Sequence, residues 1–190
     1  MARKVRPPFA WITELKRDDV PGSAREAYDE VIAAGKPQGP GAIAIHSPEL
    51  ARRRIPLNRY LRWQMAVDQR IHELTVLTTA RSLDCAYVWN AHAGEARKAG
   101  VSDALVDAIR DKNPLPDAPA EQTAVVRYVM ALFGEHKISD SIYQAAIDAF
   151  GVKDLVELTS LAGLYATNAF LVNAFDYDLP PDTTEPRLQV

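Results

Sequence analysis

Three residues suited to acid–base or thiol chemistry lie close together in the chain: Glu73, Cys85 and His92. Cys85, the only cysteine, follows Glu73 by twelve positions and precedes His92 by seven. A cysteine thiolate can attack a peroxide, whereas an imidazole titrates near neutral pH and transfers protons, often with a carboxylate beside it. The three residues therefore suggest either thiol-based reduction or proton transfer at an organic substrate.

Two helices joined by a tight turn would position these residues. The sequence predicts a helix over about 69–82 and a second over about 85–99, closed by Gly100 because glycine is the usual residue after a helix C-terminus. Asp84 is a good N-cap for the second helix, since its carboxylate can accept from the first free N–H groups. Cys85 would then lie in the first turn, where the helix dipole favours a thiolate.

The expected geometry separates the cysteine from the other two residues. A short connection favours antiparallel neighbouring helices, so Glu73 can contact His92. Cys85 lies roughly 10 Å from His92 along the helix axis, too far for a direct hydrogen bond of about 3 Å. Glu73 is predicted to orient His92 or relay its proton; the alternative is a buried pair that only joins two helices. Cys85 is either an activated thiol or an inert core side chain.

The same stretch resembles the alkyl hydroperoxidase D (AhpD) and carboxymuconolactone decarboxylase family. The hydroperoxidase motif is Glu, eleven residues, then Cys-x-x-Cys-x-x-x-His; Glu73, Cys85 and His92 fall in register, and Val88 replaces the second cysteine. The words Glu-Leu-Thr-Val-Leu and Cys-Ala-Tyr-Val-Trp-Asn-Ala-His are similar to the decarboxylase-like branch. The clear likeness covers about 40 residues, and a weaker one continues to about residue 180. The resemblance implies an all-α, AhpD-like helical bundle that forms a homo-oligomer (dimer, trimer or hexamer) with sites near subunit contacts.

Three functions stay open. Two-cysteine peroxidase chemistry within one chain is excluded, because Cys85 has no second sulfur to resolve a sulfenic acid. The leading hypothesis is a carboxymuconolactone decarboxylase-like enzyme acting on a small organic substrate by acid/base chemistry, with His92 supported by Glu73 and Cys85 lining the pocket. The alternatives are a one-cysteine alkyl hydroperoxide reductase (peroxiredoxin-type antioxidant activity) using Cys85, and a non-catalytic ligand-binding or assembly protein of the same fold.

Substrate contacts are expected from Arg81, Tyr87 and Trp89. Arg81 lies eight residues after Glu73 and could bind a substrate carboxylate, although a structural ion pair is the simpler alternative. Tyr87 and Trp89, together with Trp63, are large enough to line an apolar cavity or to pack in the core.

Other polar residues suggest no metal centre. Tyr165 and Asn168 could face the cavity or a subunit contact. His46, His72 and His136 lack metal-ligand spacing and are expected at the surface. The sequence contains no His-Glu-x-x-His motif, glycine-rich phosphate loop or Cys-x-x-Cys pair, so neither a metal nor another cofactor is expected.

Composition narrows the class of protein. The 190 residues are 47% hydrophobic and 25% charged, with a net charge of −3, which is ordinary for a soluble domain and gives no support for nucleic-acid binding. The basic run 52–54 is expected to be a solvated helix face. A single cysteine fits a reducing cytoplasm. No signal peptide is recognised, and the longest apolar stretch, 161–175, is shorter than the ~20 residues of a membrane-spanning helix, so no membrane association is expected.

The chain is predicted to be organised as an arm with a short helix (1–40), a helical domain (41–180) and an irregular tail (181–190). No strand-period alternation is found, so the predicted class is all-α. A helix is predicted to begin at Ser47-Pro48 and to continue past Trp63. Pro56 lies within this helix and could interrupt it. The remaining helices are expected over about 24–34, 102–110, 120–135, 140–150 and 154–175.

Overall fold

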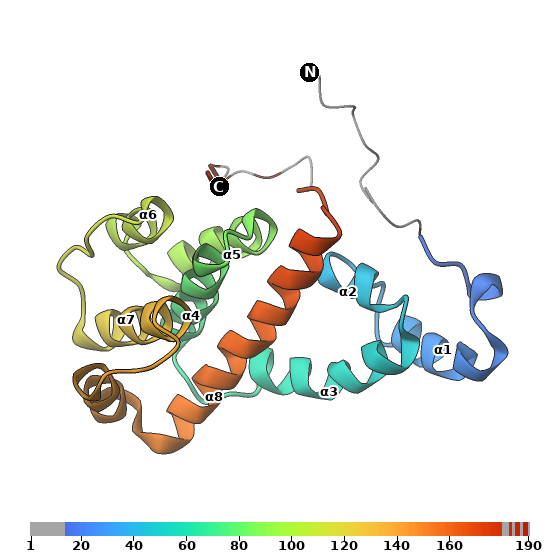
Figure 1. Cartoon of the computed structure of the whole chain (residues 1–190), viewed down its shortest axis with the longest axis horizontal. Helices are drawn as coiled ribbons and strands as arrows, with labels where there is room; N and C mark the ends of the chain where they lie inside the picture. The colour runs from blue at the N-terminus through green and yellow to red at the C-terminus, as the bar shows by residue number, and fades with distance from the viewer. Residues whose placement is uncertain (1–13, 180–182, 184, 187, 190) are drawn as a thin grey trace.

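The computed structural model describes residues 14–179, 183, 185, 186, 188 and 189, and its regular structure is helical (Figure 1). Residues 1–13 of the predicted arm (1–40) and half of the predicted tail (181–190) thus lie outside the described residues. The helices are α1 (Arg25–Ala33), α2 (Pro40–Ala44), α3 (Pro48–Trp63), α4 (Gln69–Ser82), α5 (Ala86–Ala99), α6 (Asp103–Asp111), α7 (Ala120–Gly134) and α8 (Asp140–Ala174), preceded by 3-10 turns at Arg17–Asp19 and Gly22–Ala24. No strand occurs in this part of the chain, which confirms the all-α class.

Helix α4 lies at the centre of the main core. Every residue from Ile71 to Ala80 is buried, because α5, α7 and α8 pack around the helix (Figure 1). Leu74, Leu77 and Trp89 are fully buried members of this core. Polar side chains on such a helix must find partners inside the protein, and Thr75 and Thr79 do so by donating to backbone carbonyls one turn earlier. A carboxylate on α4 is therefore confined to a fixed environment.

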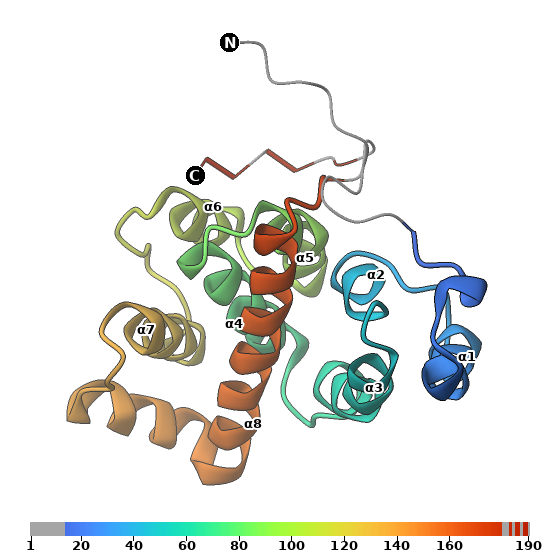
Figure 2. The same ribbon diagram turned by 45° about the vertical axis from the view of Figure 1, so that its right-hand side comes forward.

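A smaller layer formed by α1, α2 and α3 packs on the opposite side of α8 (Figures 1 and 2). This layer has its own apolar cluster, which includes Tyr28, Val31, Ala44 and Ala51. Helix α8 contacts α4, α5 and α7 on one side and α2 and α3 on the other. Side chains of α8 can therefore reach both the core around α4 and the inner face of α3.

The turn between α4 and α5 differs in one detail from the prediction. Both helices are found with the expected extents, and Gly100 ends α5 with φ of 99°. Asp84, however, is not the N-cap: its φ is 49°, and Cys85 occupies the cap position. Asp84 supplies the left-handed residue that reverses the chain, a conformation that aspartate tolerates better than most residues. Its carboxylate pairs with Arg81 and Lys112 instead of capping the helix.

Helix α3 is continuous through Pro56 and ends at Trp63. The predicted continuation past Trp63 is therefore wrong. The chain must leave the helix there because Asp68 already caps α4, accepting from the Arg70 amide at 2.8 Å. Ser47 precedes the helix as predicted but makes no side-chain cap.

Helix α8 consists of two helical segments that meet at a kink at Gly151, whose φ of 69° and ψ of 172° are not helical. This kink agrees with the predicted division into helices over about 140–150 and 154–175. By length and composition α8 could cross a membrane, but 56% of its most apolar window is buried within the fold, as is common for the core helix of a soluble protein. Homo-oligomer formation stays a prediction; Val152, Val156 and Phe170 are exposed apolar side chains of α8.

Candidate active site

Glu73 of α4 and His92 of α5 form a hydrogen-bonded pair in the protein interior. His92 Nδ1 lies 2.8 Å from Glu73 Oε2, and the two side chains are 13% and 4% exposed, respectively. Gln69 Nε2 donates to the second carboxylate oxygen, Oε1, at 2.8 Å. The expected contact between the carboxylate and the imidazole is thus present, and their orientation is fixed by a third side chain.

The ionised carboxylate of Glu73 determines which ring nitrogen of His92 carries a proton. Burial opposes ionisation of Glu73, but the imidazoles of His72 and His92 outweigh it and lower the pKa of this carboxyl to about 2. An ionised carboxylate only accepts hydrogen bonds, so His92 Nδ1 carries a proton. In the neutral imidazole, Nε2 then holds a free lone pair, and no described residue hydrogen-bonds to it. The pair therefore presents an oriented base.

His72 is buried rather than at the surface, which corrects the prediction for this residue. It is 5% exposed, and its Nδ1 lies 3.3 Å from Glu73 Oε1 without the alignment of a hydrogen bond. Its close approach helps to lower the pKa of Glu73. Helical periodicity does not predict this burial, because it assigns one solvated face to each helix, whereas α4 is covered on all sides from Ile71 to Ala80.

Tyr165 adds a third helix, α8, to the site. Its ring packs edge-to-face on the His92 imidazole, with centroids 5.0 Å apart and an interplanar angle of 89°. The residue is 3% exposed, and its Oη has no hydrogen-bond partner among the described residues. Burial raises the pKa of Tyr165 to about 12, and the positive charge of Arg62 offsets only part of that effect. The hydroxyl is therefore protonated at neutral pH and free to donate.

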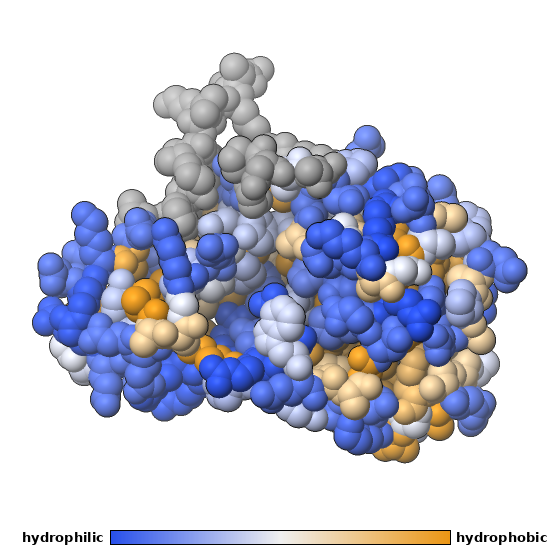
Figure 3. Space-filling view, turned by 180° about the vertical axis from the view of Figure 1, so that it is seen from behind, coloured by the Kyte–Doolittle hydropathy of each residue, from blue (hydrophilic) through white to orange (hydrophobic). Residues whose placement is uncertain are grey.

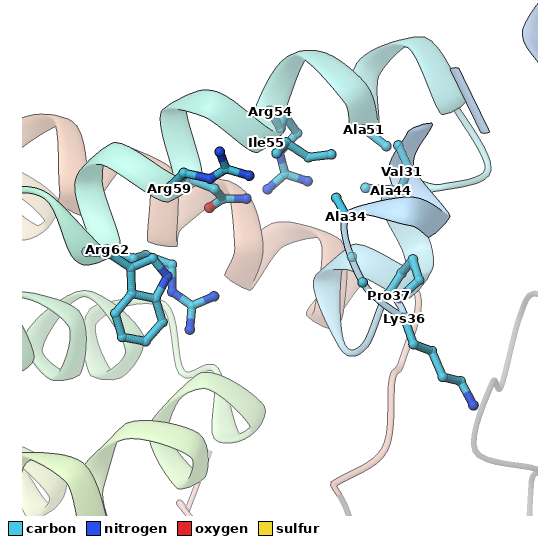
Figure 4. Close-up of a pocket in the computed structure, with 14 residues that line it drawn as sticks. Val31, Ala34, Lys36, Pro37, Ala44, Ala51, Arg54, Ile55, Arg59 and Arg62 are labelled. Carbon is cyan, nitrogen blue, oxygen red and sulfur yellow. The ribbon is translucent and has the colours of Figure 1, made fainter. Parts of the chain in front are cut away.

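A hollow of about 340 Å³ lies next to this site, lined by residues of α1, α2, α3 and the loop between α1 and α2. The space-filling view from behind shows a depression with hydrophilic walls (Figure 3). In the close-up, Arg54, Arg59 and Arg62 of α3 direct their guanidinium groups into it, whereas Lys36 extends away (Figure 4). Arg62 lines the hollow and also lowers the pKa of Tyr165, whose ring packs on His92. The hollow therefore lies close to Tyr165, at the edge of the site.

Arg54 is held at the inner side of this hollow. Its Nη2 donates to Asn168 Oδ1 at 2.6 Å, and burial lowers the pKa of its guanidinium. Asn168 follows Tyr165 by one turn of α8, so one face of this helix contacts both Arg54 at the hollow and His92. The prediction that the run 52–54 is a solvated helix face is therefore wrong for Arg54. The spacing of Arg54, Asn58 and Arg62, four residues apart, was the signal that these side chains share one face.

Comparison with known proteins agrees with this architecture. Residues 48–131 match the sequence model of the Carboxymuconolactone decarboxylase family, a range that holds both members of the Glu73–His92 pair. Over this segment the chain is similar to the carboxymuconolactone decarboxylase family. No curated protein matches the chain.

Two solved structures have a similar fold. One is a protein of unknown function from Agrobacterium tumefaciens, described as a putative antioxidant defence protein AhpD, with a TM-score of 0.64 and 20% identity over 73% of this chain and 96% of that one. The other, described as an alkylhydroperoxidase AhpD core and an uncharacterized peroxidase-related protein from Ralstonia eutropha JMP134, has a TM-score of 0.67 and 14% identity over 90% and 93% of the two chains. The predicted AhpD-like bundle is thereby confirmed as a fold.

Cys85, the single cysteine of the sequence, is fully buried. Burial raises the pKa of its thiol, and the backbone amides of Val88 and Tyr87 at the start of α5 offset only part of this. The expected thiolate is therefore not favoured: desolvation outweighs the helix N-terminus. Val88, in the position of the second motif cysteine, is 3% exposed.

Slow alkylation of Cys85 is the result expected from this environment. At pH 8 and with iodoacetamide, labelling of the native protein should be at least about 100-fold slower than in denaturant, as an opening free energy near 2.8 kcal/mol would produce. Mass spectrometry of timed samples measures the rate. Rapid native labelling below pH 8 would instead indicate an accessible, activated thiolate.

The three predicted substrate-contact residues are not gathered around the pair. Arg81 bonds Asp84 and lines a separate cavity of about 210 Å³ with Lys112 and Phe133. Tyr87 is half-buried, and its ring packs edge-to-face on Tyr177 with centroids 5.3 Å apart. Both positions suit structural roles.

The two tryptophans predicted to line a cavity lie in opposite environments. Trp89 is fully buried in the main core, whereas Trp63 is 72% exposed at the hollow beside Arg62. Among the described residues no group of three or more His, Cys, Asp and Glu side chains could hold a metal ion.

Proposed function

We propose that the protein is a small-molecule enzyme that catalyses proton transfer next to a carbonyl group, with His92 as the acid–base residue. The observation that carries this proposal is the buried Glu73–His92 hydrogen bond, which leaves Nε2 of the imidazole without a hydrogen-bond partner among the described residues. An imidazole whose other nitrogen is bonded to a carboxylate is a strong, oriented base near neutral pH.

Each group has one role in the reaction. His92 Nε2 removes the proton from the carbon beside the carbonyl, and the electron pair of that bond moves onto the carbonyl oxygen to form an enolate. Tyr165 donates its hydrogen bond to this oxygen, while Glu73 stabilises the imidazolium. The imidazolium returns the proton to the same or a conjugated carbon, which gives exchange or isomerisation. In a decarboxylation, the carbon–carbon bond to the carboxylate breaks, carbon dioxide leaves and the electron pair of that bond forms the same enolate; His92, which in this case first takes a proton from solvent, then protonates the carbon.

Thiol peroxidase chemistry has less support from the site. A peroxide must reach the sulfur, yet Cys85 is fully buried and its thiol pKa is raised. A substrate in solvent does not reach the sulfur of Cys85, and no neighbouring group lowers the pKa of its thiol below the ordinary value. The one cysteine also agrees with our placement of the enzyme in a reducing compartment such as the cytoplasm.

Carbon–hydrogen exchange tests this proposal directly. The protein is incubated in deuterium oxide with a panel of small ketones and lactones, and loss of the proton signal next to the carbonyl is followed by NMR. His92→Gln is expected to slow enzyme-dependent exchange by at least about 100-fold, the usual contribution of a general acid–base residue. Cys85→Ser is the matched comparison, and its rate should stay within about twofold of the original.

Two results would overturn the assignment. One is a panel in which no carbonyl compound exchanges faster with protein than with buffer. The other is an inverted pattern, in which Cys85→Ser abolishes exchange and His92→Gln retains it.

A further inference from the structure

We infer that the cavity beside Thr78 and Arg81 binds a small uncharged molecule, one ring in size, that carries a single hydroxyl or carbonyl oxygen. The cavity has a volume of about 210 Å³ and is formed where α6 and α7 both pack against α4 (Figures 1 and 2). None of its lining residues belongs to the Glu73–His92 pair or to the hollow lined by α1, α2 and α3. The cavity is therefore a second site, separate from the one at which the proposed reaction takes place.

The walls and the volume of the cavity suit one ring. Its lining is mostly apolar, with side chains from α6, from α7 and from the loop between them: Ala108, Ile109, Leu115, Met130 and Phe133. Met130 is 45% exposed, and a methionine at such a position adapts its shape easily because its side chain is unbranched and polarizable. An apolar cavity of about 150 Å³ is enough for benzene, so about 210 Å³ leaves room for a ring with one short polar substituent.

Two polar groups of α4 at the cavity have no hydrogen-bond partner among the described residues. Thr78 is 1% exposed, and its hydroxyl is unpaired, whereas Thr75 and Thr79 of the same helix donate to backbone carbonyls one turn earlier. The Nε–H of Arg81, three residues after Thr78, is also buried and unpaired. Residues three apart share a helix face, so one ligand oxygen could contact both groups. Because a buried polar group without a partner is costly, an incoming acceptor at this position is favoured.

The charges at the cavity favour an uncharged ligand over an anion. Arg81 and Lys112 are the cations of the lining, and both form an ion pair with Asp84, Lys112 at 3.2 Å. An anion would have to compete with Asp84 for these cations. A neutral oxygen instead accepts from the free Nε–H of Arg81 and leaves both ion pairs intact. One uncharged oxygen on an apolar body therefore fits both the walls and the polar groups of the cavity.

Ligand-detected NMR titration of the full chain tests this assignment. The probes are benzyl alcohol, toluene as a ring without oxygen, methanol as an oxygen without a ring, and benzoate as a charged ring. Benzyl alcohol is expected to bind at least about tenfold more tightly than methanol, because only the ring uses the apolar walls. Benzoate should bind more weakly than benzyl alcohol, since its charge meets cations that are already paired with Asp84.

Thr78→Val removes the unpaired hydroxyl and keeps the shape of the side chain. Benzyl alcohol should bind about fivefold more weakly to this variant, the contribution of one hydrogen bond, while the affinity for toluene should be unchanged or higher. The melting temperature should not fall, because the hydroxyl has no partner in the fold. Thr79→Val is the matched control: it removes a buried hydroxyl of α4 that does not line the cavity, so the affinity for benzyl alcohol should be unchanged.

Ala108→Leu tests the location, because Ala108 lines the cavity and a larger side chain there fills part of it. Both ring compounds should bind at least about tenfold more weakly to this variant, with the fold checked by circular dichroism. Undiminished binding of benzyl alcohol and toluene to a folded Ala108→Leu overturns the location. Equal losses for the two compounds in Thr78→Val, or tighter binding of benzoate than of benzyl alcohol, overturns the uncharged-oxygen class.

Discussion

Truncation of Trp89 to alanine is expected to destabilise the protein by about 4 kcal/mol, within the range of 3–5 kcal/mol that large-to-small aromatic substitutions cost in cores. Trp89 is fully buried on α5 and belongs to the main core around α4. Trp89 and His92 lie on the same helix, α5, so the substitution would leave a cavity beside the helix that carries His92. Urea unfolding at pH 7, followed by circular dichroism, measures the loss.

Two substitutions provide the comparison for Trp89→Ala. Trp63→Ala removes the same side chain from a 72% exposed position, and its effect should stay within about 0.5 kcal/mol. Trp89→Phe keeps an aromatic ring and removes an indole N–H that has no hydrogen-bond partner among the described residues, so it should cost much less than alanine. Equal losses in Trp63→Ala and Trp89→Ala would contradict the placement of Trp89 in the core.

The fold was accessible from sequence because its signals are local. The helix over 69–82, the turn at 84–85 and the glycine at 100 follow from periodicity, short connections and the left-handed end of a helix. The errors also have local causes. Asp84 has the composition of an N-cap, but the reversal between α4 and α5 needs a residue with positive φ, and Asp84 provides it.

The candidate site was only half accessible from sequence. The spacing of the motif identified Glu73 and His92, which contact each other across the neighbouring helices α4 and α5. Burial of His72 and the edge-to-face contact of Tyr165 depend on how α8 packs across α4 and α5, which no spacing within one segment encodes. For the same reason the sequence pattern does not single out Arg62 of α3, which lowers the pKa of Tyr165.

Acid is expected to remove about 3 kcal/mol of stability through Glu73 alone. Its pKa is lowered from 4.5 to about 2 in the fold, where the imidazoles of His72 and His92 outweigh the cost of burial. A carboxyl with a depressed native pKa stabilises the fold above its unfolded value, and that stability is lost as the pH falls through the native value. The shift of about 2.5 units corresponds to about 3 kcal/mol at 1.36 kcal/mol per unit. The loss should therefore begin below about pH 5 and be nearly complete near pH 2.

Glu73→Gln isolates this contribution, because glutamine keeps the size of the side chain and cannot ionise. The difference in unfolding free energy between the original protein and Glu73→Gln should be largest at pH 6–7 and should shrink by about 2 kcal/mol by pH 3, where much of the carboxylate's advantage has gone. Urea unfolding at pH 7, 5 and 3 supplies the values. Glu135→Gln is the matched control: Glu135 is exposed, and no ion pair is found for it in the described part of the chain, so its difference should stay small and constant with pH. Parallel pH profiles for the original protein and Glu73→Gln would show that Glu73 is not held ionised by its histidines, and the oriented base at His92 would lose its physical basis.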